Sequence, residues 1–178
     1  MSLVRGLALG RVKALDDSHR GQVQVEFENE ANDQCGITYD WARVVSPMAG
    51  EDRGEWLMPE VGDEVVVGFA DDEAVDPYVL GYVWSEPPGT NAKPPTGAAF
   101  TQRRFKSKKG HMLTFDDGDA DLIELKSHGG NVVTLDDANK KLVVQSTQGY
   151  TVTLDQNGME LKVGGRKIAI TPSTIELT

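Results

Sequence analysis

The stretches HMLTFDD (111–117), NVVTLDD (131–137), YTVTLDQ (150–156) and KIAITPS (167–173) decide the fold of the second half of this 178-residue chain. They align with Phe115, Leu135, Leu154 and Ile170 as equivalent residues, at steps of 20, 19 and 16 residues. Each copy is followed by a second alternating segment, at 122–126, 141–145, 159–163 and 174–178. Because alternation of polar and apolar residues is typical of β-strands, the repeats predict strand pairs stacked into an elongated architecture. Asn157-Gly158 predicts a two-residue hairpin turn.

The predicted strands place their apolar side chains on one face. Successive side chains of a strand point to opposite faces, so one face collects 16 apolar residues and the other holds mostly Thr, Asp, Glu, Lys and Gln. A single ribbon leaves the apolar face exposed, and we therefore expect several copies to bury it around a shared axis. The predicted core of that assembly is Leu113, Phe115, Ile123, Leu125, Val133, Leu135, Leu142, Val144, Val152, Leu154, Leu161, Val163, Ile168 and Ile170, with Ile175 and Leu177 at the end of the ribbon.

The first half of the chain also predicts strands, in shorter and unrelated runs. Residues 21–29 alternate, with Val23, Val25 and Phe27 on one face. Residues 62–70 form a continuous apolar run typical of a strand covered on both faces, and 78–84 form another apolar run. No stretch of the chain has a convincing helical stripe. The fold class is therefore all-β, and about five or six strands in some 90 residues predict a small closed barrel of the OB type.

Composition marks a boundary between the two halves. Residues 86–101 hold four of the chain's eight prolines, which is typical of an extended linker. A basic collar follows, made of Arg103, Arg104, Lys106, Lys108 and Lys109. We expect an OB-fold domain at 1–86, the Pro-rich linker and basic collar at 87–109, and the ribbon at 110–178. The collar is either a solvated face or a complement to the acidic first domain.

Charge and cysteine content exclude some function classes. Residues 1–95 hold 7 Lys/Arg and 18 Asp/Glu, whereas residues 96–178 hold 11 and 10. The acidic first half argues against nucleic acid, because phosphate binding relies on Lys and Arg. The single cysteine, Cys35, excludes an internal disulfide and a multi-cysteine metal site. No apolar run reaches the roughly 20 residues that a membrane-spanning helix needs, and the chain is expected to stay where it is made.

The sequence contains no convincing catalytic or metal-binding pattern. Asp117 to Asp121 has the D-x-D-x-D spacing of a calcium loop, but Leu122 and His128 stand where an EF-hand needs Gly and Glu. His19, His111 and His128 lack ligand spacing, and no carboxylate pair lies in an apolar run. We therefore expect no cofactor, no metal and no enzymatic activity.

Short motifs in both halves carry a family resemblance. They are Arg43-Val44, Ser46-Pro47, Ala49-Gly50, Gly54, Pro59-x-Val61-Gly62-Asp63-Glu64-Val65, Asp76-Pro77 and Gly81-x-Val83. In these the sequence resembles the OB domain of contractile-tail spike proteins, which include phage baseplate assembly protein V and the VgrG proteins of type VI secretion. Residues 106–117, 122–127 and 131–137 look like the start of the same family's triple-stranded β-helix. The resemblance spans about residues 8–178.

The resemblance implies a homotrimer, in which three OB domains form a collar and three C-terminal segments intertwine into a triangular prism. Such a protein is the non-enzymatic central spike of a phage tail, a type VI system or an extracellular injection system. It would be made in the cytoplasm and become part of a virion or injection particle that contacts the target membrane. Some relatives carry a lysozyme between collar and needle, where this chain has only its linker.

The resemblance also implies two further partners. Large VgrG chains carry a hub domain before the OB barrel, so here the hub or baseplate protein at the OB end is expected to be a separate chain, unless the sequence is a fragment. Some relatives end in a His-x-His metal tip, which this sequence lacks. A PAAR-repeat tip protein is expected to cover Ile175, Leu177 and Thr178 instead. The alternative function is a trimeric binding fibre that recognises a surface carbohydrate or protein.

Overall fold

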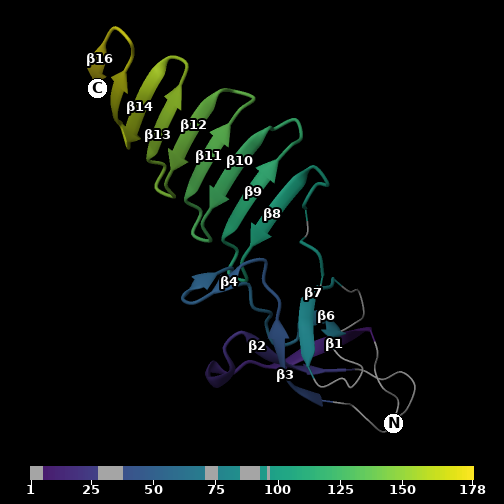
Figure 1. Ribbon diagram of the computed structural model, residues 1–178. Coiled ribbons are helices and arrows are strands. Elements are labelled where there is room, and N and C mark those ends of the chain that lie inside the picture. Colours follow the sequence, from purple (N-terminus) through teal and green to yellow (C-terminus); the bar gives the residue numbers. More distant parts are fainter. Residues whose placement is uncertain (1–5, 28–37, 71–75, 85–92, 96) are drawn as a thin grey trace. The chain divides into compact units, whose positions relative to one another are not determined.

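The computed structural model describes residues 6–27, 38–70, 76–84, 93–95 and 97–178, in two compact units that meet at Pro95 and Thr96 in the sequence (Figure 1). Cys35 and residues 86–92 and 96 of the predicted linker lie outside the described residues. The described residues form β-strands and one three-residue 3-10 turn, η1 (Asp17–His19), which is too short to cross a membrane. The all-β fold class is confirmed.

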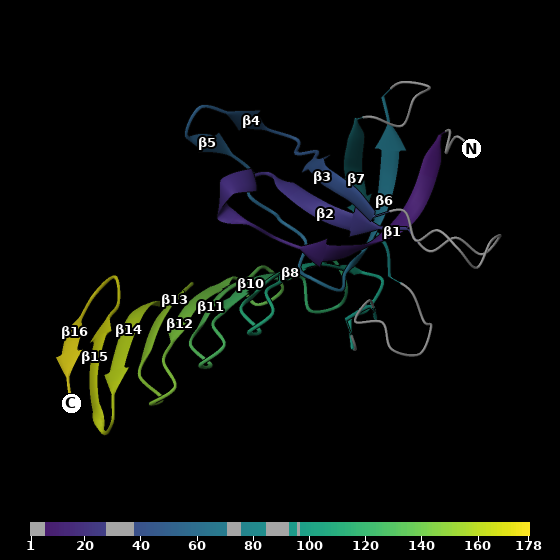
Figure 2. The same ribbon diagram turned by 90° about the horizontal axis from the view of Figure 1, so that it is seen from below.

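The first unit is a closed five-stranded barrel with the strand order β1-β2-β3-β7-β6 (Figure 2). Its neighbours pair antiparallel, except β3 and β7, which pair in parallel at Arg43↔Tyr78 and Val44↔Val79. A small hairpin, β4 and β5, lies between β3 and β6 in the sequence. The predicted OB-type barrel is confirmed. The strands are β1 (Leu7–Ala14), β2 (Gln22–Glu26), β3 (Thr38–Val44), β4 (Ala49–Gly50), β5 (Arg53–Gly54), β6 (Glu64–Phe69) and β7 (Pro77–Tyr82).

The barrel core is small and built almost entirely from β-branched residues. Its buried members are Val12, Val23, Val25, Phe27, Ala42, Val65, Val67 and Val79. The predicted inward face of the first alternating segment is thus confirmed. The prediction that the apolar run at 62–70 is covered on both faces is wrong, because Val66 is only half-buried. A barrel is one sheet thick, so only one face of each strand meets the core.

The second unit is an antiparallel meander of nine strands in sequence order, β8 to β16, which we call the ribbon (Figure 1). Each strand pairs only with the strands before and after it. All eight segments that the repeats predict as strands form strands of this sheet. They are β8 (Gln102–Lys106), β9 (Met112–Asp116), β10 (Leu122–Lys126), β11 (Val132–Asp136), β12 (Lys141–Gln145), β13 (Thr151–Asp155), β14 (Gly158–Val163), β15 (Arg166–Ile170) and β16 (Ile175–Leu177).

Three turns along one side of the ribbon share one construction. In each, a serine Oγ accepts a hydrogen bond from the backbone N–H four residues later, at distances of 3.0, 3.0 and 3.1 Å. A glycine with positive φ precedes that N–H, at Gly110, Gly130 and Gly149. Ser and Gly therefore recur at fixed places because each turn needs a side-chain acceptor and a left-handed residue.

The ribbon differs from expectation at two places. It begins at β8, inside the segment predicted as linker and collar, because Gln102 to Lys106 form a strand that pairs with β9 and places Phe105 opposite Leu113. The loop between β13 and β14 is Gln156-Asn157, one residue earlier than the Asn157-Gly158 signal. There the Asn157 N–H donates to the Asp155 side chain, 2.7 Å away.

The barrel's close strand packing yields a test at Gly10 in β1. A Cβ at this position would lie 2.4 Å from Val25 Cγ1, inside the core, so Gly10→Ala is expected to destabilise the barrel by about 1–3 kcal/mol. Gly81→Ala in β7 is the matched control, because a Cβ there meets nothing within 4 Å. Urea unfolding followed by tryptophan fluorescence checks this, since all three tryptophans belong to the first half. Equal midpoints for the two variants would contradict it.

Candidate assembly surfaces

The ribbon has one apolar face that a single chain leaves open. Cross-strand register places the apolar residues opposite one another, as with Ile123 between Phe115 and Leu135. Thirteen large apolar side chains on this face are between 36% and 75% exposed: Phe105, Phe115, Ile123, Leu125, Leu135, Val144, Leu154, Met159, Leu161, Val163, Ile168, Ile175 and Leu177. The other predicted core residues, Leu113, Val133, Leu142, Val152 and Ile170, lie on the same face and are half-buried.

Two residues of this face were not among the predicted core residues. Met159 lies opposite Leu154 and Ile170, and Phe105 lies opposite Leu113. The alternation of β14 was a usable signal for Met159, since it has the same parity as Leu161. Phe105 had no such signal, because the charged residues around it resemble a linker.

The opposite face of the ribbon is polar and satisfies much of its own charge. Glu160 Oε1 lies 2.6 Å from Lys162 Nζ, and its Oε2 lies 3.5 Å from Lys167 Nζ. Thr114 on this face is only 4% exposed. The face that needs a cover is therefore the apolar one.

The C-terminal end of the ribbon is an exposed apolar end. Ile175 is 72% exposed and Leu177 is 75% exposed, the highest values on the apolar face. Thr178 exchanges two backbone hydrogen bonds with Lys167, at 2.7 and 2.9 Å, so the last residue still belongs to the sheet. Among the described residues, β16 pairs only with β15.

The motif from Pro59 to Val65 in the barrel is a turn that starts β6. The backbone N–H of Gly62, whose φ is +97°, donates to the Val12 carbonyl at 2.8 Å, and the Glu60 N–H donates to Asp63 Oδ2 at 2.8 Å. Pro59 and Val65 are fully buried, Glu64 pairs with β1, and Val61 is 55% exposed. The motif thus explains the entry of β6 into the barrel and forms no pocket of its own.

The other quoted motifs close the barrel between β3 and β7. Arg43 lies over the Tyr78 ring at 4.5 Å, donates to the Tyr78 hydroxyl and lies 3.5 Å from Asp76 Oδ1. These contacts accompany the short parallel pair that joins the two strands.

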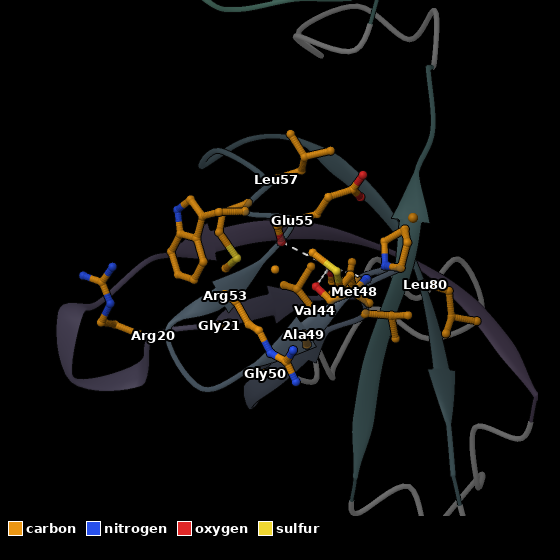
Figure 3. Close-up of a pocket in the computed structure, with 18 of the residues that line it drawn as sticks. Arg20, Gly21, Val44, Met48, Ala49, Gly50, Arg53, Glu55, Leu57 and Leu80 are labelled. Carbon is orange, nitrogen blue, oxygen red and sulfur yellow. Dashed lines mark hydrogen bonds between the residues drawn. The ribbon is translucent and has the colours of Figure 1, made fainter.

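A groove of about 890 Å³ lies between the β4–β5 hairpin and the β3 and β7 strands (Figure 3). Ser46 Oγ holds the hairpin, lying 2.9 Å from the Met48 carbonyl oxygen and 3.1 Å from that of Glu55. The groove is lined by exposed apolar side chains, including Met48, Leu57 and Leu80, which are 57%, 57% and 49% exposed. The described part of the barrel thus carries a concave surface that is partly apolar.

Three aromatic residues of the first unit lie outside the barrel core. Trp56, Tyr82 and Trp84 are 60%, 50% and 68% exposed, so core packing does not explain them. The Tyr82 hydroxyl donates to the Leu57 carbonyl, and burial together with the charge of Asp63 raises the pKa of Tyr82. Arg20 lies 5.1 Å from the Trp56 ring.

The histidines and the aspartate loop have structural surroundings. His19 stacks on Trp41 at 4.2 Å, and the rings of His111 and His128 are 6.3 Å apart at neighbouring turns. Asp117 pairs with Arg103 at 3.4 Å. Within the described ranges, no three or more His, Cys, Asp or Glu side chains lie close enough to hold a metal ion.

A barrel of the OB type followed by an open antiparallel ribbon defines a class of modular all-β assembly protein. Residues 8–84 match the family described as the type VI secretion system/phage-baseplate injector OB domain. The first unit is therefore similar to injector OB domains, and the resemblance to the VgrG and baseplate spike family is confirmed.

Three proteins of Pseudomonas aeruginosa illustrate the relationship. The chain is 29% identical over 91 residues to the type VI secretion system spike protein VgrG1a, covering 51% of this chain and 14% of the relative. It is 26% identical over 119 residues to VgrG2a, covering 64% and 14%. It is 28% identical over 126 residues to VgrG4b, covering 61% and 15%. The chain thus spans about one seventh of the length of these relatives.

The ribbon's aspartates generate a pH prediction. The hydrogen bonds from the Gln102 side chain and the Gly118 N–H lower the pKa of Asp116 below 3.8, and those from the Asn139 side chain and N–H lower that of Asp136. A carboxylate with a lowered folded-state pKa stabilises the fold above its unfolded pKa, and this stabilisation is lost as the pH falls. The ribbon is therefore expected to lose stability as the pH falls below about 3.8.

Urea unfolding of the ribbon by circular dichroism, repeated across the acidic range, measures this effect. Asp116→Asn/Asp136→Asn is expected to flatten the pH dependence, because the amides do not titrate. Glu176→Gln is the control, since Glu176 is exposed in β16 of the same ribbon. An unchanged pH dependence in the double variant would contradict the assignment.

Proposed function

We propose that the chain is the central spike of a contractile injection machine and acts as a homotrimer. The observation that carries the proposal is the open apolar face of the ribbon in the same chain as an injector OB barrel. Apolar side chains at 36% to 75% exposure along nine strands are costly in water, and a second layer of protein removes that cost.

Three copies of the ribbon would supply each other's second layer. With the apolar faces turned to a common axis, the residues predicted as the trimer core lie inside an intertwined triangular prism. The number three comes from the family resemblance, and the continuous apolar face supports it. The rest of the domain plan is proposed with it: OB domain at 1–86, linker and collar at 87–109, and β-helix needle at 110–178, preceded by β8.

The barrel end is proposed to join a hub or baseplate protein. The groove beside the β4–β5 hairpin is the concave apolar surface available for such a contact on the described part of the barrel. The spike would link this hub to a tip that pierces the target membrane, without catalysing a reaction. It would be assembled in the cytoplasm and carried in a virion or injection particle.

The needle end is proposed to bind a PAAR-repeat tip protein. Three copies of β16 side by side would present three Ile175 and three Leu177 side chains on one triangular face. Exposed apolar ends and open strand edges favour association with a partner. Thr178 completes this face, since it is hydrogen-bonded to Lys167.

Leu154→Asp tests the trimer and its core. It is expected to dissociate the trimer, because three carboxylates would meet near one axis at a cost of several kcal/mol per ion. Thr151→Asp in the same strand is the matched control, since its polar-face position lies opposite Lys162. Thr153 is less suitable because it lies opposite Glu160. Size exclusion with light scattering should give three times 19.4 kDa for the parent and for Thr151→Asp.

A monomeric parent protein at micromolar concentration would overturn the spike proposal. Equal masses and melting temperatures for Leu154→Asp and Thr151→Asp would show instead that the apolar face does not point to the axis.

Ile175→Ser/Leu177→Ser tests the tip contact. The pair is expected to abolish capture of a PAAR-repeat protein encoded beside this chain, because the apolar end face is lost. The trimer is expected to persist, since the other apolar strands remain. Glu176→Ser is the control, because Glu176 points to the opposite face between the two changed residues. Equal capture by both variants in a pull-down would contradict the proposed tip surface.

A further inference from the structure

The meander separates the charges of the ribbon onto its two turn edges. Successive turns of an antiparallel meander lie on alternate sides, so turns 107–111, 127–131 and 146–150 share one edge, and turns 117–121 and 137–140 share the other. The first edge, which we call the basic edge, includes Lys106, Lys108, Lys109, His111, Lys126 and His128, and its turns hold no Asp or Glu. The second, the acidic edge, includes Asp116, Asp117, Asp119, Asp121, Asp136 and Asp137.

The charge separation is strong but not complete. Lys140 and Lys141 belong to the acidic edge, and Arg103 of β8 neutralises Asp117 at 3.4 Å. The exposed residues Asp119, Asp121 and Asp137 have no ion-pair partner among the described residues. These three carboxylates are therefore available to a partner.

The two edges of one ribbon do not reach each other. Strands β9 to β12 have five residues each, which span about 16 Å at roughly 3.3 Å per residue. An ion pair needs its charged atoms within about 4 Å, and salt screens exposed charges beyond about 8–10 Å. The two edges of one ribbon therefore cannot neutralise each other, and a second ribbon can supply the complement of each.

A second copy of the chain is the partner that fits both edges. In a ring of copies, each copy presents one edge to its neighbour on one side and the opposite edge to its neighbour on the other. The basic edge of one copy then meets the acidic edge of the next. Side-by-side two-fold pairing would instead bring like edges together, which is repulsive.

We propose that ion pairs between the basic edge of one copy and the acidic edge of the next orient and close the ring of ribbons. The inference rests on the proposed trimer and adds the interaction that joins the edges of neighbouring ribbons at each corner of the prism. Most charged residues of both edges belong to β8 to β12 and their turns. Asp155 and Arg166 extend the acidic and the basic edge into the later strands, whereas the later turns 146–150, 156–157, 164–165 and 171–174 are uncharged. Ion pairs between neighbouring copies thus lie mainly in the half of the needle that is nearer the barrel in sequence. Association of the later half depends mainly on burial of apolar side chains.

Charge reversal with rescue tests the inference on the full chain. Asp119→Lys/Asp121→Lys/Asp137→Lys makes both edges basic, and Lys106→Glu/Lys109→Glu/Lys126→Glu makes both edges acidic. Each set is expected to weaken trimer assembly about ten-fold or more at low salt, since several exposed pairs are lost at every corner. Combining both sets exchanges the signs of the edges and is expected to restore assembly. Asp17→Lys/Glu51→Lys on the barrel controls for the change in net charge.

Sedimentation at graded protein concentration measures assembly, and circular dichroism checks that each variant folds. The parent trimer is also expected to weaken as sodium chloride is added, which tests the inference even if a variant fails to fold. A parent monomer would overturn the proposed function itself. Three outcomes would overturn the edge pairing and leave the spike proposal intact. They are a parent trimer whose assembly does not depend on salt, charge-reversed variants that assemble normally, and a combined variant that does not restore assembly.

Discussion

The open apolar face of a one-layer sheet is the constraint on which the rest of this protein depends. The barrel solves the same problem by closing on itself, so that Val12, Val25 and Val65 meet inside with no exposure. The ribbon is a meander whose first and last strands lie at opposite ends of a nine-stranded sheet, and it leaves Leu125 and Leu154 exposed. One chain therefore combines a barrel that buries its own apolar side chains with a ribbon whose apolar face we propose to be covered by further copies of the chain.

The open ribbon and the closed barrel suit different parts of the proposed spike. A rigid needle benefits from strands whose apolar side chains interlock along an axis, since bending would expose them. Three turns support such stiffness, because a serine and a glycine fix the geometry of each. Backbone N–H groups of His128 and Thr147 also donate to His111 Nδ1 and Asn131 Oδ1, which joins neighbouring turns. The quoted motifs of the barrel, in turn, include its closure at Arg43 and the entry of β6 at Gly62.

Parity along the strands was sufficient to predict much of the candidate surface. Phe115, Leu135 and Leu154 share a face in the sheet, as their alternation indicates, because side-chain direction in a strand depends only on position along it. Phe105 was not predictable in this way, since a strand dominated by Arg and Lys has no apolar alternation. Val66 was misjudged because an apolar run is equally typical of a strand whose second face stays open.

The sequence by itself determined the all-β class, the strand pairs of the repeats, the polar and apolar faces and the family of the barrel. These follow from local alternation, turn residues and short motifs, which need no knowledge of distant partners. Only the tertiary structure decided that β3 and β7 close the barrel in parallel, that β8 belongs to the ribbon, and that Lys126 and Asp136 lie on opposite edges. Those features depend on which strands pair, and pairing joins residues far apart in the chain through backbone hydrogen bonds that carry no side-chain signature.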